Sequence, residues 1–205
     1  MDGEWEEELR GVGNIEEGSG RIMLKELEGA IKKLKKGKAA GSDEIMGEMI
    51  KAGGGVLCNW LVRLMNVCWE RGRVPKDWQE ACVVPVYKGR GNKNECGSYR
   101  GISMMSIVGK LYGRVVINRV NHITEGLVGE EQGGFRKGRG CVDQVFAVKG
   151  LCEKYREKGR ELYLGFMDLE KAYDRIDREA LWRVVRKYGV NGRLLIALKS
   201  FLVNS

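Results

Sequence analysis

Residues 162–174, LYLGFMDLEKAYD, decide how the carboxyl-terminal part of the chain is interpreted. Leu162, Leu164, Phe166 and Asp168 fall on one face if the segment is extended, so the alternation predicts a strand over 162–168. An aspartate that closes an apolar strand is costly unless it is paired or bound to a cation. The ordinary alternative is a solvated aspartate that caps the following turn. The spacing alone does not decide between the two.

The segments before and after this stretch are mainly helical. Apolar residues at spacings of three and four predict amphipathic helices, with Ser42 or Asp43 as the N-cap of the second and Asp177 as the N-cap of the fifth. The predicted helices cover residues 24–36, 44–71, 108–121, 145–158, 178–188 and 192–202.

Strands are few and short in this sequence. The β-branched run Ala81–Tyr87 predicts a strand, and Pro85 inside it favours a sheet edge or a bulge. A short strand or turn is expected at Tyr99–Ile102, after a polar loop over 88–98. Long helices with short strands indicate an α+β fold in which helices outnumber strands.

Charge is distributed unevenly along the chain. The formal net charge is +8, yet residues 1–20 hold seven acidic residues and one basic residue, a net of −6. The remaining residues therefore carry +14, which suits a polyanionic partner such as nucleic acid, although a solvated basic surface gives the same number. We expect residues 1–20 to form an acidic linker or tail.

The cysteines and the amino terminus exclude several other classes. None of the six cysteines forms a C-x-x-C pair, and His122 is the only histidine, which argues against a structural zinc site. The acidic start lacks the apolar core of a signal peptide, and the apolar runs are too short to span a bilayer. We therefore expect reduced thiols in a cytoplasmic or nuclear protein that is not secreted.

Five blocks in a fixed order resemble the reverse transcriptases of non-LTR (LINE-type) retrotransposons. Each block alone is a weak signal, but their order makes a chance match improbable. The blocks are GKAAGSD (37–43), VPKDW through VPVYK (74–88), YRGIS (99–103), QGGFR with the following DQ (132–144), and FMDLEKAYD (166–174). Four positions depart from the family pattern, which is compatible with a decayed element copy: Ser42 for proline, Glu44 for glycine, Gly101 for proline and Gly133 for alanine.

The resemblance implies a right-hand polymerase fold of which this chain holds the fingers and part of the palm. The implied boundaries are fingers at 21–160 and the start of an incomplete palm sheet at 161–205. The implied activity is RNA-directed DNA polymerisation, a nucleotidyl transfer with Mg²⁺ as cofactor. The implied partners are an RNA template, a DNA primer and deoxynucleoside triphosphates.

The resemblance also implies roles for individual residues. Asp168 and the backbone carbonyl of Leu169 would bind magnesium, because hard divalent cations take oxygen ligands. Tyr173 would exclude a ribose hydroxyl, and Lys88 and Arg100 would hold the triphosphate. The template would lie along the loop 132–139, with contacts from Gln132, Gly134, Phe135, Arg136, Lys137 and Arg139.

Part of the family's catalytic motif set is missing from these 205 residues. The family's later palm motif has two adjacent aspartates, whereas no two aspartates of this chain are neighbours. We therefore expect the fragment alone to be inactive. Two alternatives remain open: a non-catalytic basic nucleic-acid-binding module, and a relic that does not fold stably.

Overall fold

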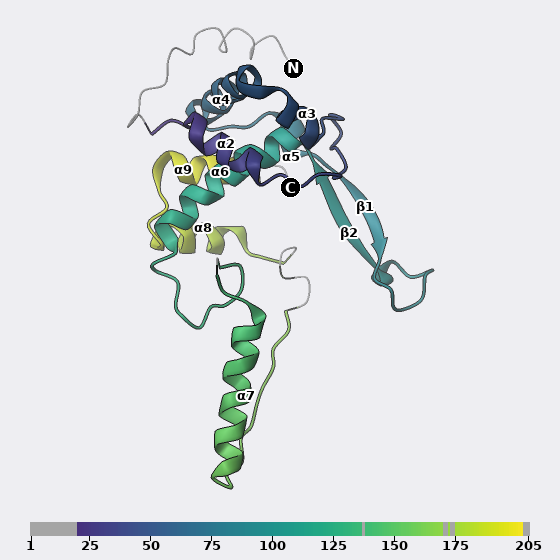
Figure 1. Cartoon of the computed structure of the whole chain (residues 1–205), viewed down its shortest axis with the longest axis vertical. Coiled ribbons are helices and arrows are strands. Elements are labelled where there is room, and N and C mark those ends of the chain that lie inside the picture. Colours follow the sequence, from purple (N-terminus) through teal and green to yellow (C-terminus); the bar gives the residue numbers. More distant parts are fainter. Residues whose placement is uncertain (1–19, 137, 170–171, 173–174, 203–205) are drawn as a thin grey trace. The chain divides into compact units, whose positions relative to one another are not determined.

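The computed structural model describes residues 20–136, 138–169, 172 and 175–202 (Figure 1). The chain divides into unit 1, residues 1–120 and 191–205, and unit 2, residues 121–190, and each unit is described by itself. Within the described residues, no helix is both long enough and apolar enough to cross a membrane. The expected acidic tail at 1–20 falls almost entirely outside the described part of the chain.

Unit 1 is built from helices packed around one apolar cluster, together with a β-hairpin. Helix α6 begins in this unit and ends in unit 2. The helices of unit 1 are α2 (Leu24–Lys32), α3 (Gly47–Ala52), α4 (Gly54–Arg71), α5 (Lys76–Gln79), α6 (Ile107–Thr124) and α9 (Gly192–Ser200).

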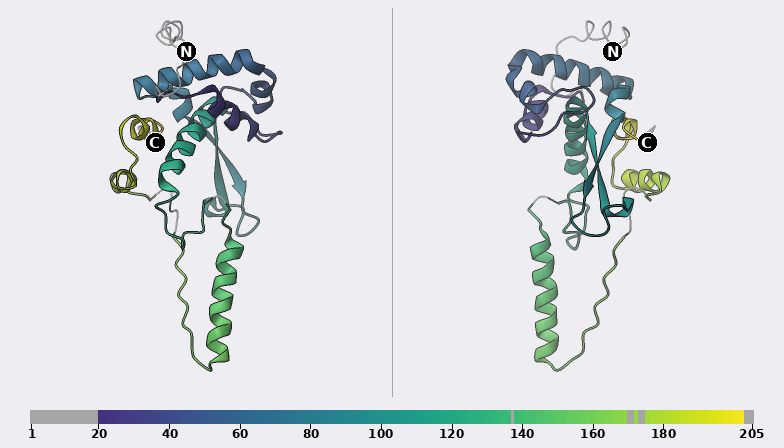
Figure 2. Two further views of the ribbon diagram at one scale, coloured as in Figure 1. Left: turned by 60° about the vertical axis from the view of Figure 1, so that its left-hand side comes forward. Right: turned by 90° about the vertical axis from the view of Figure 1, so that its right-hand side faces the viewer.

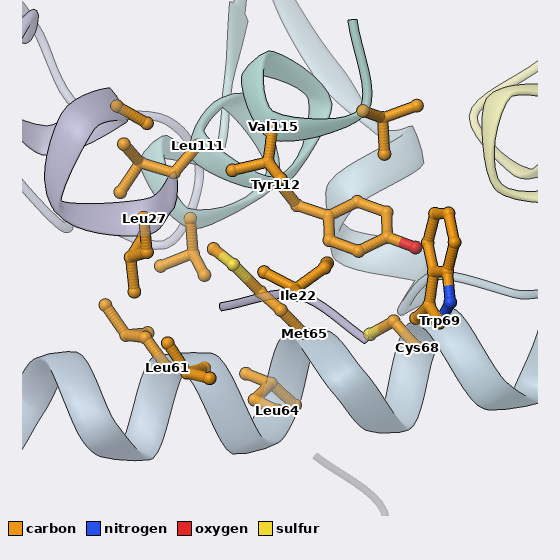
Figure 3. Packing of buried hydrophobic residues seen from close by; sticks show 14 of the residues in the cluster. Ile22, Leu27, Leu61, Leu64, Met65, Cys68, Trp69, Leu111, Tyr112 and Val115 are labelled. Atoms are coloured by element: carbon orange, nitrogen blue, oxygen red, sulfur yellow. The ribbon is translucent and has the colours of Figure 1, made fainter. Parts of the chain in front are cut away.

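The core of unit 1 forms where the apolar faces of α2, α4 and α6 meet. Leu27 from α2, Met65 from α4 and Tyr112 from α6 belong to one buried cluster, and Figure 3 shows the Tyr112 ring directed toward Trp69. The side chains of Leu27, Met65 and Tyr112 are fully buried. Removing such side chains from water supplies most of the favourable free energy of folding, so this cluster holds unit 1 together.

Two polar residues fix the segments that flank this core. The side chain of the buried Asn66 accepts a hydrogen bond from the Ile22 amide (2.7 Å) and donates to the Ile22 carbonyl (2.9 Å). Gln79 Nε2 donates to the Ser200 carbonyl at 2.8 Å, which connects α5 to the end of α9. Since buried polar groups are costly unless paired, these bonds define where both segments dock.

Strands β1 (Ala81–Tyr87) and β2 (Tyr99–Met105) form an antiparallel hairpin. The register is continuous from the Ala81–Met105 pair to the Tyr87–Tyr99 pair, and Pro85 stands opposite Gly101 without a bulge. A sheet of two strands has only edges, so the prediction that Pro85 lies on an edge strand is confirmed. A short 3₁₀ helix, η1 (Cys96–Ser98), leads into β2.

Unit 2 holds the end of α6, a glycine-rich loop, and helices α7 (Cys141–Glu157) and α8 (Arg178–Lys187). Figure 2 shows the chain returning from the end of α7 as an extended trace. Residues 161–169 of this trace have no regular secondary structure. Asp177 Oδ1 accepts hydrogen bonds from the amides of Glu179 and Ala180, so its predicted N-cap role is confirmed.

Two local predictions were wrong. The strand expected over 162–168 does not form, because a strand requires a hydrogen-bonded neighbour and no described segment pairs with it. Neither Ser42 nor Asp43 caps a helix. The carboxylate of Asp43 instead accepts a hydrogen bond from the Ile45 amide (3.1 Å) in a local turn, and the next helix starts at Gly47.

Candidate functional site

The loop end of the hairpin is ordered by its two tyrosines. The rings of Tyr87 and Tyr99 meet edge to face with centroids 5.6 Å apart. Tyr87 donates its hydroxyl to the Gly91 carbonyl (2.7 Å), and Tyr99 donates to the Lys93 carbonyl (2.9 Å). These contacts hold the loop over 88–98 against the ends of both strands.

Lys88 and Arg100, the predicted triphosphate residues, lie together at this end of the hairpin. Arg100 stands opposite Val86 in the register, and the Lys88 amide donates to the Ser98 carbonyl (2.9 Å). Because side chains alternate along a strand, this register puts Lys88 and Arg100 on the same face. Lys88 Nζ donates to the Gly97 carbonyl (2.8 Å), whereas the exposed Arg100 has no hydrogen-bonded or ion-paired side-chain partner among the described residues.

The Gly37–Asp43 block packs against the opposite end of β2. A Cβ atom at Gly41 would lie 2.6 Å from the Met105 carbonyl carbon and 2.7 Å from the Ser106 amide nitrogen. Only glycine permits this approach of two backbones, so the block depends on Gly41 for packing. The Gly37–Asp43 block therefore contacts the end of β2, the strand that begins with the YRGIS block.

In unit 2, the predicted template loop is tied to itself and to the end of α6. Arg136 donates to the carbonyls of Gly129 (2.8 Å) and Glu125 (3.4 Å), and only 15% of its side chain is exposed. Arg139 forms an ion pair with Glu130. Both arginines therefore hold the loop in shape, which the sequence did not predict. Lys137 lies outside the described residues.

The same loop presents an aromatic ring to solvent. Phe135 has a φ of +61° and a side chain that is 96% exposed. This residue and Gln132 line a pocket of about 260 Å³ that also includes Thr124 and Val128. A positive φ is uncommon for a bulky residue. The surrounding structure must therefore stabilise this backbone conformation at Phe135.

The loop also meets the next part of its own block. A Cβ atom at Gly133 would lie 2.7 Å from Nε2 of Gln144, so the Gln144 side chain covers this glycine. The carboxylate of Asp143 accepts a hydrogen bond from the Gly140 amide (2.9 Å) at the start of α7. The structure therefore brings together the QGGFR and DQ parts of the block.

Asp168 is exposed in unit 2 and has no hydrogen-bonded or ion-paired partner among the described residues. Leu169 beside it is 69% exposed, and Tyr173 lies outside the described residues. No group of three or more His, Cys, Asp or Glu side chains that could hold a metal ion occurs in the described part of the chain. The described residues therefore supply a single carboxylate here, which does not make a complete magnesium site.

Comparison with known proteins identifies the family. Residues 91–205 match the reverse transcriptase (RNA-dependent DNA polymerase) family, which is more than half of the chain. The chain belongs to the reverse transcriptase family. The predicted resemblance to non-LTR retrotransposon enzymes is confirmed, because its relatives carry those names.

Three Drosophila melanogaster relatives show the extent of this similarity. The chain is 30% identical over 190 residues to the probable RNA-directed DNA polymerase from transposon BS, covering 88% of this chain and 20% of that protein. It is 26% identical to the RNA-directed DNA polymerase from mobile element jockey, covering 88% and 20%. It is 30% identical to a putative 115 kDa protein in the type-1 retrotransposable element R1DM, covering 76% and 15%. The chain thus spans about a fifth of the length of the first two relatives.

Proposed function

We propose that the chain forms the fingers, over residues 21–160, and the start of the palm, over 161–205, of a right-hand RNA-directed DNA polymerase. The family match and the order of the five blocks support this assignment. The helix-rich α+β arrangement with a two-stranded sheet is compatible with it. The proposed partners of the whole polymerase are an RNA template, a DNA primer and deoxynucleoside triphosphates.

The observation that carries the proposal is the pair of cations at the end of the hairpin. We propose that Lys88 and Arg100 hold the triphosphate of the incoming nucleotide. Cations stabilise phosphates by neutralising charge, and a guanidinium adds two parallel hydrogen bonds. Arg100 contributes more, because Lys88 Nζ already donates to the Gly97 carbonyl and must leave it to contact a phosphate.

Binding of a fluorescently labelled deoxynucleoside triphosphate to the chain, followed by anisotropy, tests this pair. We expect Arg100→Gln to weaken binding about tenfold, which corresponds to about 1.4 kcal/mol, and Lys88→Gln to weaken it less. The matched control is Lys149→Gln, which removes an exposed lysine of α7 near Glu153. Equal affinity of the Arg100→Gln, Lys149→Gln and unmodified chains would refute the assignment.

We propose that Asp168 and the backbone carbonyl of Leu169 belong to the magnesium site of the complete polymerase, beside Tyr173 as the gate for the sugar. The family resemblance implies a two-metal site there. One carboxylate holds two magnesium ions poorly against water, so the 205 residues alone should not extend a primer. Extension of oligo-dT on poly-A with Mg²⁺ tests this, and incorporation above an Asp168→Ala control would overturn it.

We further propose that the loop 132–139 contacts the template chiefly through Phe135. An exposed aromatic ring stacks on a base of any sequence, and such stacking is worth about 1–3 kcal/mol per base. Arg136 and Arg139 act mainly by holding the loop, together with Gln132 and Gly134. Phe135→Ala should weaken binding of a single-stranded RNA, whereas Phe135→Tyr should preserve it. Equal loss in both variants would exclude stacking.

A further inference from the structure

A groove in unit 1 concentrates positive charge away from the hairpin. It lies between the end of α2 and the middle of α6, and its volume is about 530 Å³. This volume falls within the range of roughly 300–1,000 Å³ that is usual for ligand pockets. Its lining includes three cations, Lys33, Lys110 and Arg114, together with Leu34, Ile117 and Asn118.

The periodicity of α6 builds one wall of this groove. Lys110, Arg114 and Ile117 follow one another at spacings of four and three, so they share one helix face. The neighbouring positions Tyr112 and Val115 are buried in the core, which fixes the rotation of α6 about its axis. The same packing that forms the core therefore presents this row of side chains to the groove.

Within the part of the chain that the structure describes, carboxylates do not neutralise the groove cations. Lys33 and Lys110 have no carboxylate within ion-pair distance among the described residues. Arg114 makes a long hydrogen bond to the Ala30 carbonyl (3.5 Å), a neutral acceptor. Elsewhere in unit 1 the fold does pair its charges, as in the Arg119–Glu26 ion pair at 2.7 Å. Unpaired cations in a concave site raise the local positive potential and attract an anionic ligand.

We propose that this groove binds the sugar–phosphate backbone of a nucleic-acid strand. The three cations suit successive phosphates, and the apolar surface of Leu34 and Ile117 suits the sugars. The +14 charge outside residues 1–20 favours such a partner. The site shares no residue with the proposed nucleotide and template contacts, so it does not depend on them.

Anisotropy of a labelled single-stranded oligonucleotide of mixed sequence, titrated with the full chain between 50 and 200 mM salt, tests the proposal. The variant is Lys33→Gln with Lys110→Gln, which leaves the Arg114 hydrogen bond in place. Each phosphate contact on a single strand contributes about 0.7 to the slope of log affinity against log salt, so the slope should fall by about 1.4. Affinity at 50 mM salt should fall roughly tenfold, uniformly across sequences.

Two control variants separate the effect of the groove lysines on binding from effects of total charge and of folding. Lys76→Gln with Lys149→Gln removes the same charge at exposed lysines that lie near Glu80 and Glu153, and should keep the slope. Lys33→Arg with Lys110→Arg keeps the charge and should also keep the slope.

An unchanged slope in the double glutamine variant, with a normal melting temperature, would overturn the proposal. Binding of polyglutamate at this groove without binding of the oligonucleotide would overturn it too. Binding of labelled deoxynucleoside triphosphate is expected to survive these changes. Refutation of nucleic-acid binding at the groove would therefore not affect the assignment of Lys88 and Arg100. Refutation of that assignment would likewise not affect the groove proposal.

Discussion

Replacing Arg119 with methionine removes a guanidinium that joins three parts of unit 1. Its nitrogens donate two hydrogen bonds to the Glu26 carboxylate at 2.7 Å, one to the Gly20 carbonyl at 2.8 Å and one to the Arg21 carbonyl at 2.6 Å. The guanidinium also lies 4.9 Å from the centroid of the Trp69 ring. The side chains of Arg119 and Glu26 are 21% and 26% exposed, so solvent screens the pair only in part.

The expected loss of stability follows from the partial burial of the Arg119–Glu26 pair. Hydrogen bonds to charged groups contribute about 1.5–3 kcal/mol when buried, whereas exposed pairs contribute less than about 1 kcal/mol. The cation–π contact with Trp69 adds about 0.5–1 kcal/mol. We expect Arg119→Met to lower the free energy of unfolding by about 2–3 kcal/mol. About 1–2 kcal/mol of this should be coupling to Glu26, with the rest from the carbonyl contacts and Trp69.

A double-mutant cycle with Arg119→Met and Glu26→Gln measures the coupling. Urea unfolding followed by tryptophan fluorescence suits it, because Trp69 is buried beside the pair. Glu26→Gln keeps the shape of the side chain and removes its charge. A coupling below about 0.5 kcal/mol would show that the ion pair contributes no more than an exposed one, and the reasoning from its partial burial would be wrong.

The same pair predicts a dependence of stability on pH. Burial raises the pKa of Glu26, but hydrogen bonds from Arg119 and from the Met23 amide outweigh it and leave the pKa below its ordinary value of 4.5. A depressed folded-state pKa contributes stability that is present above pH 4.5 and is lost as pH falls through the folded-state pKa. The Glu26→Gln chain should therefore lose less stability below pH 4.5 than the unmodified chain does.

Three further outcomes follow from single residues. Tyr112→Phe should leave stability unchanged or raise it by about 1 kcal/mol in urea unfolding, because the buried hydroxyl has no hydrogen-bond partner among the described residues; a loss above 1 kcal/mol would reveal a partner. Asp177→Ala should destabilise α8 by about 1 kcal/mol and speed hydrogen exchange at the Glu179 and Ala180 amides, whereas Asp177→Asn should change both less. Burial raises the pKa of Cys68 to about 12, so a thiol reagent at pH 8 should label the exposed Cys82 and spare Cys68 until the chain unfolds; equal labelling rates in the folded chain would contradict this.

The elements that the sequence predicted correctly are those whose stability is local or comes from one apolar face. The strand Ala81–Tyr87 forms at the predicted residues, and helices form at all six predicted places, with shifted ends and the second region split in two. Periodicity identifies such elements because it marks an apolar face, which is buried in α4 but not in α7. The segment 162–168 shows the same alternation without forming a strand. Alternation reports a preference for extended structure, whereas a strand also needs a neighbour to accept its hydrogen bonds.

The residues at the candidate sites were harder to predict because their roles depend on contacts distant in the sequence. That Lys88 and Arg100 share a face follows from the hairpin register, which their spacing does not specify. Arg136 was predicted as a phosphate contact, and the hydrogen bonds from its mostly buried side chain to carbonyl oxygens became visible only in the structure. Gly41 belonged to a predicted block. Its close backbone contact with the end of β2 could not be predicted without knowing where β2 lies.

Helix α7 explains why the proposed magnesium contact of Asp168 needs a different experiment from the proposed triphosphate contacts of Lys88 and Arg100. It has 17 residues, none of them buried, whereas α4 has 18 residues of which nine are buried. An isolated helix of this length is only marginally stable in water, because packing of an apolar face supplies most helical stability. Asp168 follows α7 on a segment that no described strand pairs with, so little free energy fixes its position. Lys88 and Arg100 are held by a paired hairpin, and nucleotide binding by this chain tests them without requiring that the carboxylate be in place.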